Sequence, residues 1–192
     1  MKGSGRCAVR CFTGRRPDML SIADFVWPTG LRRHININIV TWSEYMVSND
    51  VPKNARGDWT GIAGHYRRRT DSIVVAVRRN IGYPVEQGYA KGKLYNIQNR
   101  SEAYVYLLAH ELRHAWQKWR NVASKYRVTF NDDKEHRVVF VELGGGGGYG
   151  YDYRSRPPRP RWWLSRHVTR EADADEYAVK MVKAWRKRAA RP

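Results

Sequence analysis

The sequence is poor in cysteine, in long apolar runs and in acidic side chains. Only two of its 192 residues are cysteines, Cys7 and Cys11, so a disulfide-based scaffold is excluded and a reducing compartment is expected. No apolar run approaches the roughly 18 residues of a membrane-spanning helix, and the first residues lack the apolar stretch of a secretory signal. We therefore expect a cytoplasmic protein with no membrane partner.

Charge is strongly biased towards one sign. The 18 Asp and Glu residues face 36 Lys and Arg residues, which gives a formal net charge of +18. Two windows, residues 154–170 and 180–191, each hold six Lys or Arg residues and no acid. Such segments are attracted to polyanions, so nucleic acid is a candidate partner through the Arg-rich segments. The alternative interpretation is a solvated basic face that keeps the chain soluble.

Length and aromatic content favour one folded domain. A chain of 192 residues is close to the size of a single domain, and eight Trp and twelve Tyr residues provide large side chains for a core. We expect residues 1–20 to form a flexible basic arm ahead of a single domain over residues 21–192. Five consecutive glycines followed by Tyr, Arg and Pro predict an irregular insertion at about residues 143–163. Its composition suits either RNA binding or a tolerated surface loop.

Local patterns predict both strands and helices, hence an α+β fold. Alternating or β-branched stretches predict two hairpins and one further strand, at residues 61–67 with 72–77, 126–130 with 137–141, and 34–40. Gly and Pro predict loops at residues 48–58 and 81–93. Helices are predicted at residues 101–120, capped by Ser101, and at residues 169–188. The second helix has acidic first turns and basic last turns, which complement the helix dipole.

The helix predicted over residues 101–120 contains the segment His110-Glu111-Leu112-Arg113-His114, an H-E-x-x-H motif. One turn separates the two histidines, so both imidazoles leave one face with about 5–6 Å between Cβ atoms, which suits two bonds to one zinc ion. Glu111 can take a proton from a water molecule that zinc makes acidic. Composition alone gives about 0.008 chance matches in such a chain, so the motif indicates a metal site. The opposite face is expected to bury a single apolar stripe, made of Tyr104, Leu108, Leu112, Ala115 and Trp119.

A catalytic zinc site needs a third protein ligand besides the two histidines. Glu171 and Asp175 lie four residues apart on the predicted last helix, so they share a face. We favour Glu171 as the third ligand, with Asp175 accepting a hydrogen bond from the far nitrogen of a zinc histidine. The other candidates for the third ligand are His136, His167, Asp173 and Asp175 itself.

Residues 107–115 and 171–178 together resemble the small gluzincin-type zinc metallopeptidases, which include the ImmA/IrrE-like cytoplasmic peptidases of bacteria and phages. The resemblance implies a zinc peptidase that carries one catalytic Zn²⁺. It implies that the general base is Glu111 and that the three metal ligands are His110, His114 and Glu171.

The same resemblance carries an expectation for the fold. In a zincin-like arrangement, a short mixed sheet packs on the active-site helix, and a C-terminal helix carries the third ligand. Residues 72–77 would be the edge strand of that sheet, which holds an extended substrate by strand addition. The resemblance covers about residues 60–185. The 56 residues between His114 and Glu171 make a longer gap than compact members have, and the insertion accounts for much of it.

Two assignments stay open in the sequence. A more distant resemblance to SprT-like proteases, which act on proteins at DNA, would make His136 the third ligand. The donor that stabilises a developing oxyanion is also open. We favour His167, one turn before Glu171, over the other candidates, which are His65, Tyr151, Tyr153 and Tyr177.

The sequence thus predicts a hydrolase, a zinc-dependent metallopeptidase that acts on a protein or peptide substrate. The alternative is a basic nucleic-acid-binding protein on the same fold, in which zinc is structural or absent. Glu111 separates the two hypotheses, because a purely structural site has no use for a base beside the metal.

Overall fold

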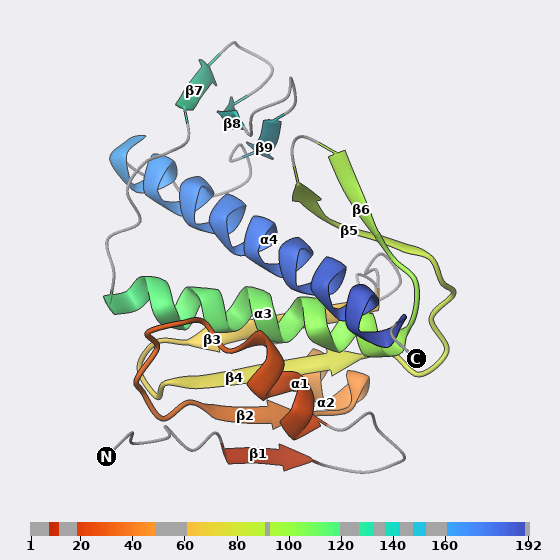
Figure 1. Cartoon of the computed structure of the whole chain (residues 1–192). Helices are drawn as coiled ribbons and strands as arrows, with labels where there is room; N and C mark the ends of the chain where they lie inside the picture. Colours follow the sequence, from red (N-terminus) through yellow and green to blue (C-terminus); the bar gives the residue numbers. More distant parts are fainter. Residues whose placement is uncertain are drawn as a thin grey trace.

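The computed structural model describes residues 8–11, 19–48, 61–90, 93–119, 127–132, 137–142, 148–152 and 161–190. These residues form a four-stranded mixed sheet, a two-stranded and a three-stranded antiparallel sheet, and four helices (Figure 1). The predicted α+β class and its short mixed sheet are confirmed. No helix within these ranges is both long enough and apolar enough to cross a membrane.

The four-stranded sheet has the order β1-β2-β4-β3, in which β1, β2 and β4 run parallel and β3 runs antiparallel to β4. Its strands are β1 (Ala8–Cys11), β2 (Asn36–Ile39), β3 (Ile62–Arg67) and β4 (Ser72–Val77). Strands β2, β3 and β4 confirm the three strands predicted from alternation and β-branching. The turn between β3 and β4, at residues 68–71, lies where the predicted hairpin requires it.

Two expectations about this sheet are wrong. Residues 8–11 belong to the predicted flexible arm, yet Val9 pairs with Ile37 in a parallel ladder, because a short segment gains backbone hydrogen bonds along an open strand. The resemblance implies that residues 72–77 form the edge, but β4 is a central strand. All six of its residues are buried, as in strands that are covered on both faces. The edge strand beside the motif helix is β3.

Helix α3 (Arg100–Trp119) lies between the sheet and helix α4 (Arg161–Ala189), as Figure 1 shows. Every residue from 102 to 109 is buried, so the expectation of a single apolar stripe is wrong. The physical reason is that α3 packs against a sheet on one side and a helix on the other. Strands β2 and β4 share the resulting core with α3 through Ile37, Ile39, Ile73, Val75, Leu108 and Leu112.

Helix α3 confirms the predicted helix, but its N-cap is Asn99 rather than Ser101. The backbone N–H of Glu102 donates to Oδ1 of Asn99 at 3.0 Å, and the N–H of Ala103 donates to the Asn99 carbonyl at 3.1 Å. Asparagine and serine are similarly good caps. The cap is the residue whose side chain reaches a free N–H of the first turn. Here Asn99 reaches the N–H of Glu102, three residues later.

Helix α4 begins at Arg161, well before the predicted start at residue 169. Leu164 and Val168 are buried and extend the buried face of Ala172 at helical spacing. The first turn of α4 therefore has no acid, and the acidic residues lie mid-helix, so our dipole interpretation of them is wrong. The basic last turn is confirmed.

The remaining elements surround the sheet, α3 and α4. Strands β7 (Arg127–Asp132) and β8 (Arg137–Glu142) confirm the second predicted hairpin. Four stretches for which the sequence predicts a loop or no regular element instead hold regular elements. These are β5 (Val85–Ala90) with β6 (Lys93–Ile97), β9 (Gly148–Asp152), and the short helices α1 (Met19–Val26) and α2 (Trp42–Ser48). Of these, α1, β5 and β6 contribute buried residues to the same core. Glycine weakens strands without forbidding them, so pairing with a neighbouring strand decides the cases of β5, β6 and β9. Most of the predicted loop at residues 48–58 and of the insertion lies outside the described residues.

Candidate metal centre

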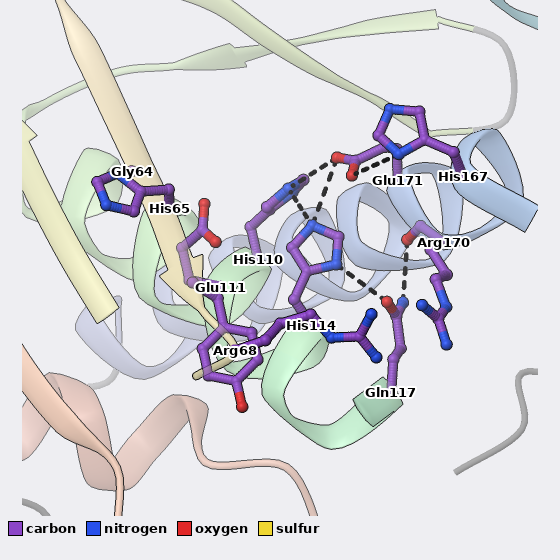
Figure 2. Close-up of a pocket in the computed structure, with 11 residues that line it drawn as sticks. Gly64, His65, Arg68, His110, Glu111, His114, Gln117, His167, Arg170 and Glu171 are labelled. Carbon is purple, nitrogen blue, oxygen red and sulfur yellow. Dashed lines mark hydrogen bonds and ion pairs between the residues drawn. The ribbon is translucent and has the colours of Figure 1, made fainter. Parts of the chain in front are cut away.

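The histidines of the motif on α3 face Glu171 of α4, where the two helices pack together (Figure 2). Nε2 of His110 lies 3.0 Å from Nε2 of His114, and Oε2 of Glu171 lies 3.4 Å from each of these nitrogens. A tetrahedral zinc ion with bonds of about 2.0–2.1 Å holds its ligand atoms about 3.3 Å apart. The three atoms therefore have the mutual spacing of three zinc ligands.

Hydrogen bonds on the far side of His114 direct its lone pair at this point. The amide nitrogen of Gln117 donates to the carbonyl of Arg170 and to Oδ2 of Asp173, both at 2.9 Å. The amide oxygen of Gln117 is then the atom that lies 2.9 Å from Nδ1 of His114. Because an oxygen can only accept, Nδ1 carries the proton and Nε2 keeps its lone pair.

His110 has an acidic neighbour at the corresponding nitrogen. Oδ1 of Asp175 lies 2.9 Å from Nδ1 of His110, at an ion-pair distance rather than in line for a hydrogen bond. The hydroxyl of Tyr106 donates to the same carboxylate oxygen at 2.5 Å. A proton on Nδ1 is the arrangement that this contact favours, which leaves Nε2 to face Glu171 and His114. Asp175 lies where the sequence predicts the partner of a zinc histidine.

Positive charge is favoured at the point that the three atoms face. Burial lowers the pKa of His110, but Asp175 and Glu171 outweigh burial and raise that pKa well above its ordinary value. Burial would raise the pKa of Glu171, yet its contacts with both imidazoles hold that pKa far below the ordinary range. Glu171 therefore stays ionised. The field that favours a proton on His110 favours a metal ion at the same point.

Glu111, the acid of the motif, lies on the opposite side of His110 from Glu171, near the edge strand (Figure 2). It is only 5% exposed, and the backbone N–H of Tyr66 on β3 donates to its carboxylate. Burial is the main reason that the pKa of Glu111 lies above its ordinary value. A carboxylate with a raised pKa is a better general base near neutral pH.

Gly64 on β3 provides the room for this carboxylate. A Cβ atom at residue 64 would lie 3.2 Å from Oε1 of Glu111 and 3.2 Å from Cγ1 of Val75. Both distances are shorter than ordinary packing contacts, so a side chain here would displace Glu111 or the neighbouring strand. The absence of a side chain at Gly64 therefore lets the edge strand pass close to the motif.

A pocket of about 360 Å³ lies over the centre, between α3, α4 and the edge strand. Its lining unites the motif with residues of the other two elements and consists of Gly64, His65, Tyr66, Arg68, His110, Glu111, His114, Gln117, His167, Arg170 and Glu171. His167 contributes Nδ1, which lies 3.8 Å from Oε1 of Glu171. The structure thus brings His167 and all the predicted metal ligands into one pocket.

Other candidates from the sequence lie elsewhere. Asp173 accepts two hydrogen bonds from the guanidinium of Arg113, at 2.6 and 3.1 Å, and is not one of the three converging ligands. The hydroxyl of Tyr177 donates to the carbonyl of Val26 at 2.8 Å, away from this pocket. His65 does line the pocket. The remaining candidates fall outside the residues, or the side chains, that the structure describes, namely His136, Tyr151 and Tyr153.

Sequence reasoning missed the residues that hold the ligands in place. Gln117 lies three residues after His114 and Tyr106 four residues before His110, so helical spacing alone could have placed both beside the motif. Gly64 could not have been found in this way, because its role depends on the approach of a strand to a helix.

No protein-family model, no curated protein and no solved structure matches the chain. The function is therefore inferred from the pocket itself. That pocket holds two imidazole lone pairs, an ionised carboxylate and a second, buried carboxylate beside an edge strand.

Proposed function

We propose that the protein is a zinc-dependent metallopeptidase of zincin-like build and gluzincin type. The observation that carries the proposal is the convergence of His110, His114 and Glu171 at zinc-ligand spacing in the pocket that also holds Glu111. Three protein ligands are typical of a catalytic zinc site, whereas a structural site usually has four. Within the described part of the chain, this cluster offers three.

The chain's own residues supply the proton transfers. When bound, zinc contributes Lewis acidity, which makes a water molecule more acidic and polarises a carbonyl. The carboxylate of Glu111 takes the proton of the attacking water and can then deliver it to the leaving amine. The N–H of Tyr66 holds this carboxylate against the edge strand during both transfers. We assign His167, in the same pocket, as the candidate donor to the oxyanion.

A peptide is favoured as the substrate because an edge strand lies beside the centre. Strand β3 forms an edge of the described mixed sheet and contributes Gly64, His65 and Tyr66 to the pocket. An extended peptide can add to such an edge through main-chain hydrogen bonds. Strand addition would carry one of its peptide bonds past Glu111, which lies against β3.

The substitution Glu111→Gln tests the proposal, because it preserves size and removes the base. Hydrolysis of a quenched fluorescent peptide library should fall by about 10²–10⁴-fold, while the zinc content stays at about one ion per chain. Glu86→Gln is the matched control, since Glu86 is exposed on β5 and does not line the pocket. Undiminished hydrolysis by Glu111→Gln, or no hydrolysis by zinc-loaded wild type, would contradict the proposal.

A further inference from the structure

The pocket contains a pair of arginines that the peptidase chemistry does not use. Arg68 lies in the turn between β3 and β4, and Arg170 precedes Glu171 on α4. Figure 2 shows their guanidinium groups on either side of Gln117, at the end of the pocket where His114 lies. Because the two charges come from different elements, the pair results from the fold and not from one basic run.

Hydrogen bonds fix the backbone at both arginines. Nζ of Lys118 donates to the carbonyl of Arg68 and to Oδ1 of Asp71, each at 2.7 Å. The amide of Gln117 donates to the carbonyl of Arg170 at 2.9 Å. Gln117 and Lys118 are neighbours on α3, so the last turns of the motif helix position both arginines. Such pre-organisation reduces the ordering cost of binding a ligand.

Neither guanidinium of this pair has an acidic partner within the described ranges. By contrast, the guanidiniums of Arg113 and Arg186 each face a carboxylate across the α3–α4 interface. Arg166 and Arg68 both lie close enough to Arg170 for their positive charges to act on it. An anion that entered this end of the pocket would therefore meet two positive charges with which no described carboxylate forms an ion pair.

We propose that Arg68 and Arg170 form a subsite that binds a carboxylate group of the peptide substrate. The inference rests on the proposed peptidase function. Arginine forms forked, charge-assisted hydrogen bonds with carboxylates. A peptide extended along β3 advances about 3.3 Å per residue, and Arg68 follows Gly64, which borders Glu111, by four positions. The carboxylate thus lies within about four residues of the bond that is cut.

A carboxylate suits the subsite better than the backbone of a nucleic acid. The pair lines a pocket of about 360 Å³, within the size range of small-ligand sites. Single-stranded nucleic acids are bound in long basic grooves with aromatic stacking platforms. The pair also shares its pocket with the candidate metal centre, where a peptide carbonyl would react.

Binding by the inactive Glu111→Gln protein, loaded with zinc, tests the subsite without relying on turnover. The probe is a rhodamine-labelled, C-terminally amidated 12-residue peptide of Ala, Ser, Gly and Gln, in which one Glu is moved through every position. Fluorescence anisotropy should show affinity at least about tenfold higher for Glu than for Gln over a short run of positions. In a parallel arm, the all-Gln peptide with a free C-terminus tests whether a terminal carboxylate gives the same gain.

Two pairs of substitutions separate the subsite from the general basic charge. Arg68→Gln with Arg170→Gln should abolish the preference for Glu. The matched double variant, Arg78→Gln with Arg79→Gln, removes the same charge from exposed residues outside the pocket. It should keep the preference for Glu peptides. If the pocket pair loses zinc or unfolds, the single change Arg68→Glu must instead transfer the preference from Glu to Lys peptides.

The outcomes are distinct. The inference is supported if the protein prefers Glu peptides, or the peptide with a free C-terminus, and if only the loss of Arg68 and Arg170 removes that preference. Which of the two peptides is preferred identifies the source of the carboxylate. Three results would overturn the inference. They are equal affinity for all peptides, an equal loss of the Glu preference in both double variants, and an unchanged preference in Arg68→Glu. Competition by oligothymidylate that depends on the pocket pair would also overturn it in favour of a phosphate ligand. Binding without any cleavage by the wild type would overturn the peptidase proposal and leave the subsite standing.

Discussion

Two polar clusters join α3 to α4, and their chemistry differs. At the start of α3, the carboxylate of Glu102 accepts two hydrogen bonds from Arg186, at 2.8 and 2.6 Å, and one from the N–H of Gln98 at 2.8 Å. At the middle of α3 and one turn beyond it, His110 and His114 meet Glu171 of α4, and the three residues direct three electron-rich atoms at one point. The first cluster is closed, because donors meet acceptors. The second cluster brings together three groups that could hold a metal ion. The comparison therefore sets residues that stabilise the fold beside residues that are candidates for binding a ligand.

The closed cluster should matter for stability and not for metal binding. Glu102→Ala removes the carboxylate and leaves Arg186 without its partner. The free energy of unfolding in urea should fall by about 3 kcal/mol, the low end for a broken buried pair because Arg186 is partly exposed. The zinc content should not change. A loss of zinc without a loss of stability would reverse the roles that we assign to the two clusters.

The metal cluster should respond instead to the residue that orients His114. Gln117→Leu keeps the volume but removes the acceptor for Nδ1 of His114, so the zinc affinity should fall by about 10–100-fold. The matched control is Gln98→Leu in the closed cluster. Gln98 is exposed and contacts Glu102 through its backbone N–H, so this change removes no side-chain contact of either cluster. Competition with a chelator measures both affinities. Equal affinities in the two variants would show that Gln117 does not orient the ligand.

The closed cluster should also lose its contribution to stability in acid. Burial raises the pKa of Glu102, but the hydrogen bonds from Arg186 and from the N–H of Gln98 outweigh burial, so the folded pKa lies below the ordinary 4.5. A lowered folded pKa contributes stability that is present above the unfolded pKa and is lost as the pH falls through the folded one. The stability of the metal-free wild type should therefore decline below about pH 4.5. Glu102→Ala should decline less steeply, and identical slopes would contradict the assignment.

The smallest expected effect concerns the approach of β3 to the metal cluster. Gly64→Ala would displace Glu111 by a few tenths of an ångström, so hydrolysis should fall by about 3–10-fold with unchanged zinc content. Gly82→Ala is the control, because no atom lies within 4 Å of its added Cβ. An unaffected rate in Gly64→Ala would mean that the position of Glu111 tolerates this shift.

The parts of the fold that the sequence predicts are those that local patterns decide. Strand β4 reads as a strand because its β-branched run is continuous, and α3 reads as a helix because its apolar residues recur at helical spacing. Strands β1, β5 and β9 escape prediction because they are short or contain glycine, and their pairing depends on partners elsewhere in the chain. The start of α4 is misjudged because its acidic residues imitate a first turn.

The residues of the candidate site likewise divide into those that local spacing predicts and those that depend on tertiary packing. His110 and His114 are predictable because one helix carries both, and Glu171 with Asp175 because a second helix repeats the same spacing. Gln117 is within reach of the same reasoning. Gly64 and the pair of Arg68 with Arg170 are not, because their positions follow from the packing of β3 and α4 against α3, which no single segment encodes.

The most direct test of the account is the zinc content of the purified protein, measured by elemental analysis after reconstitution and removal of free metal. The account predicts about one zinc ion per chain in the wild type and in Glu102→Ala, and almost none in His114→Ala and Glu171→Ala. A wild type that binds no zinc, or a Glu171→Ala variant that binds as much as the wild type, would contradict the proposed metal centre.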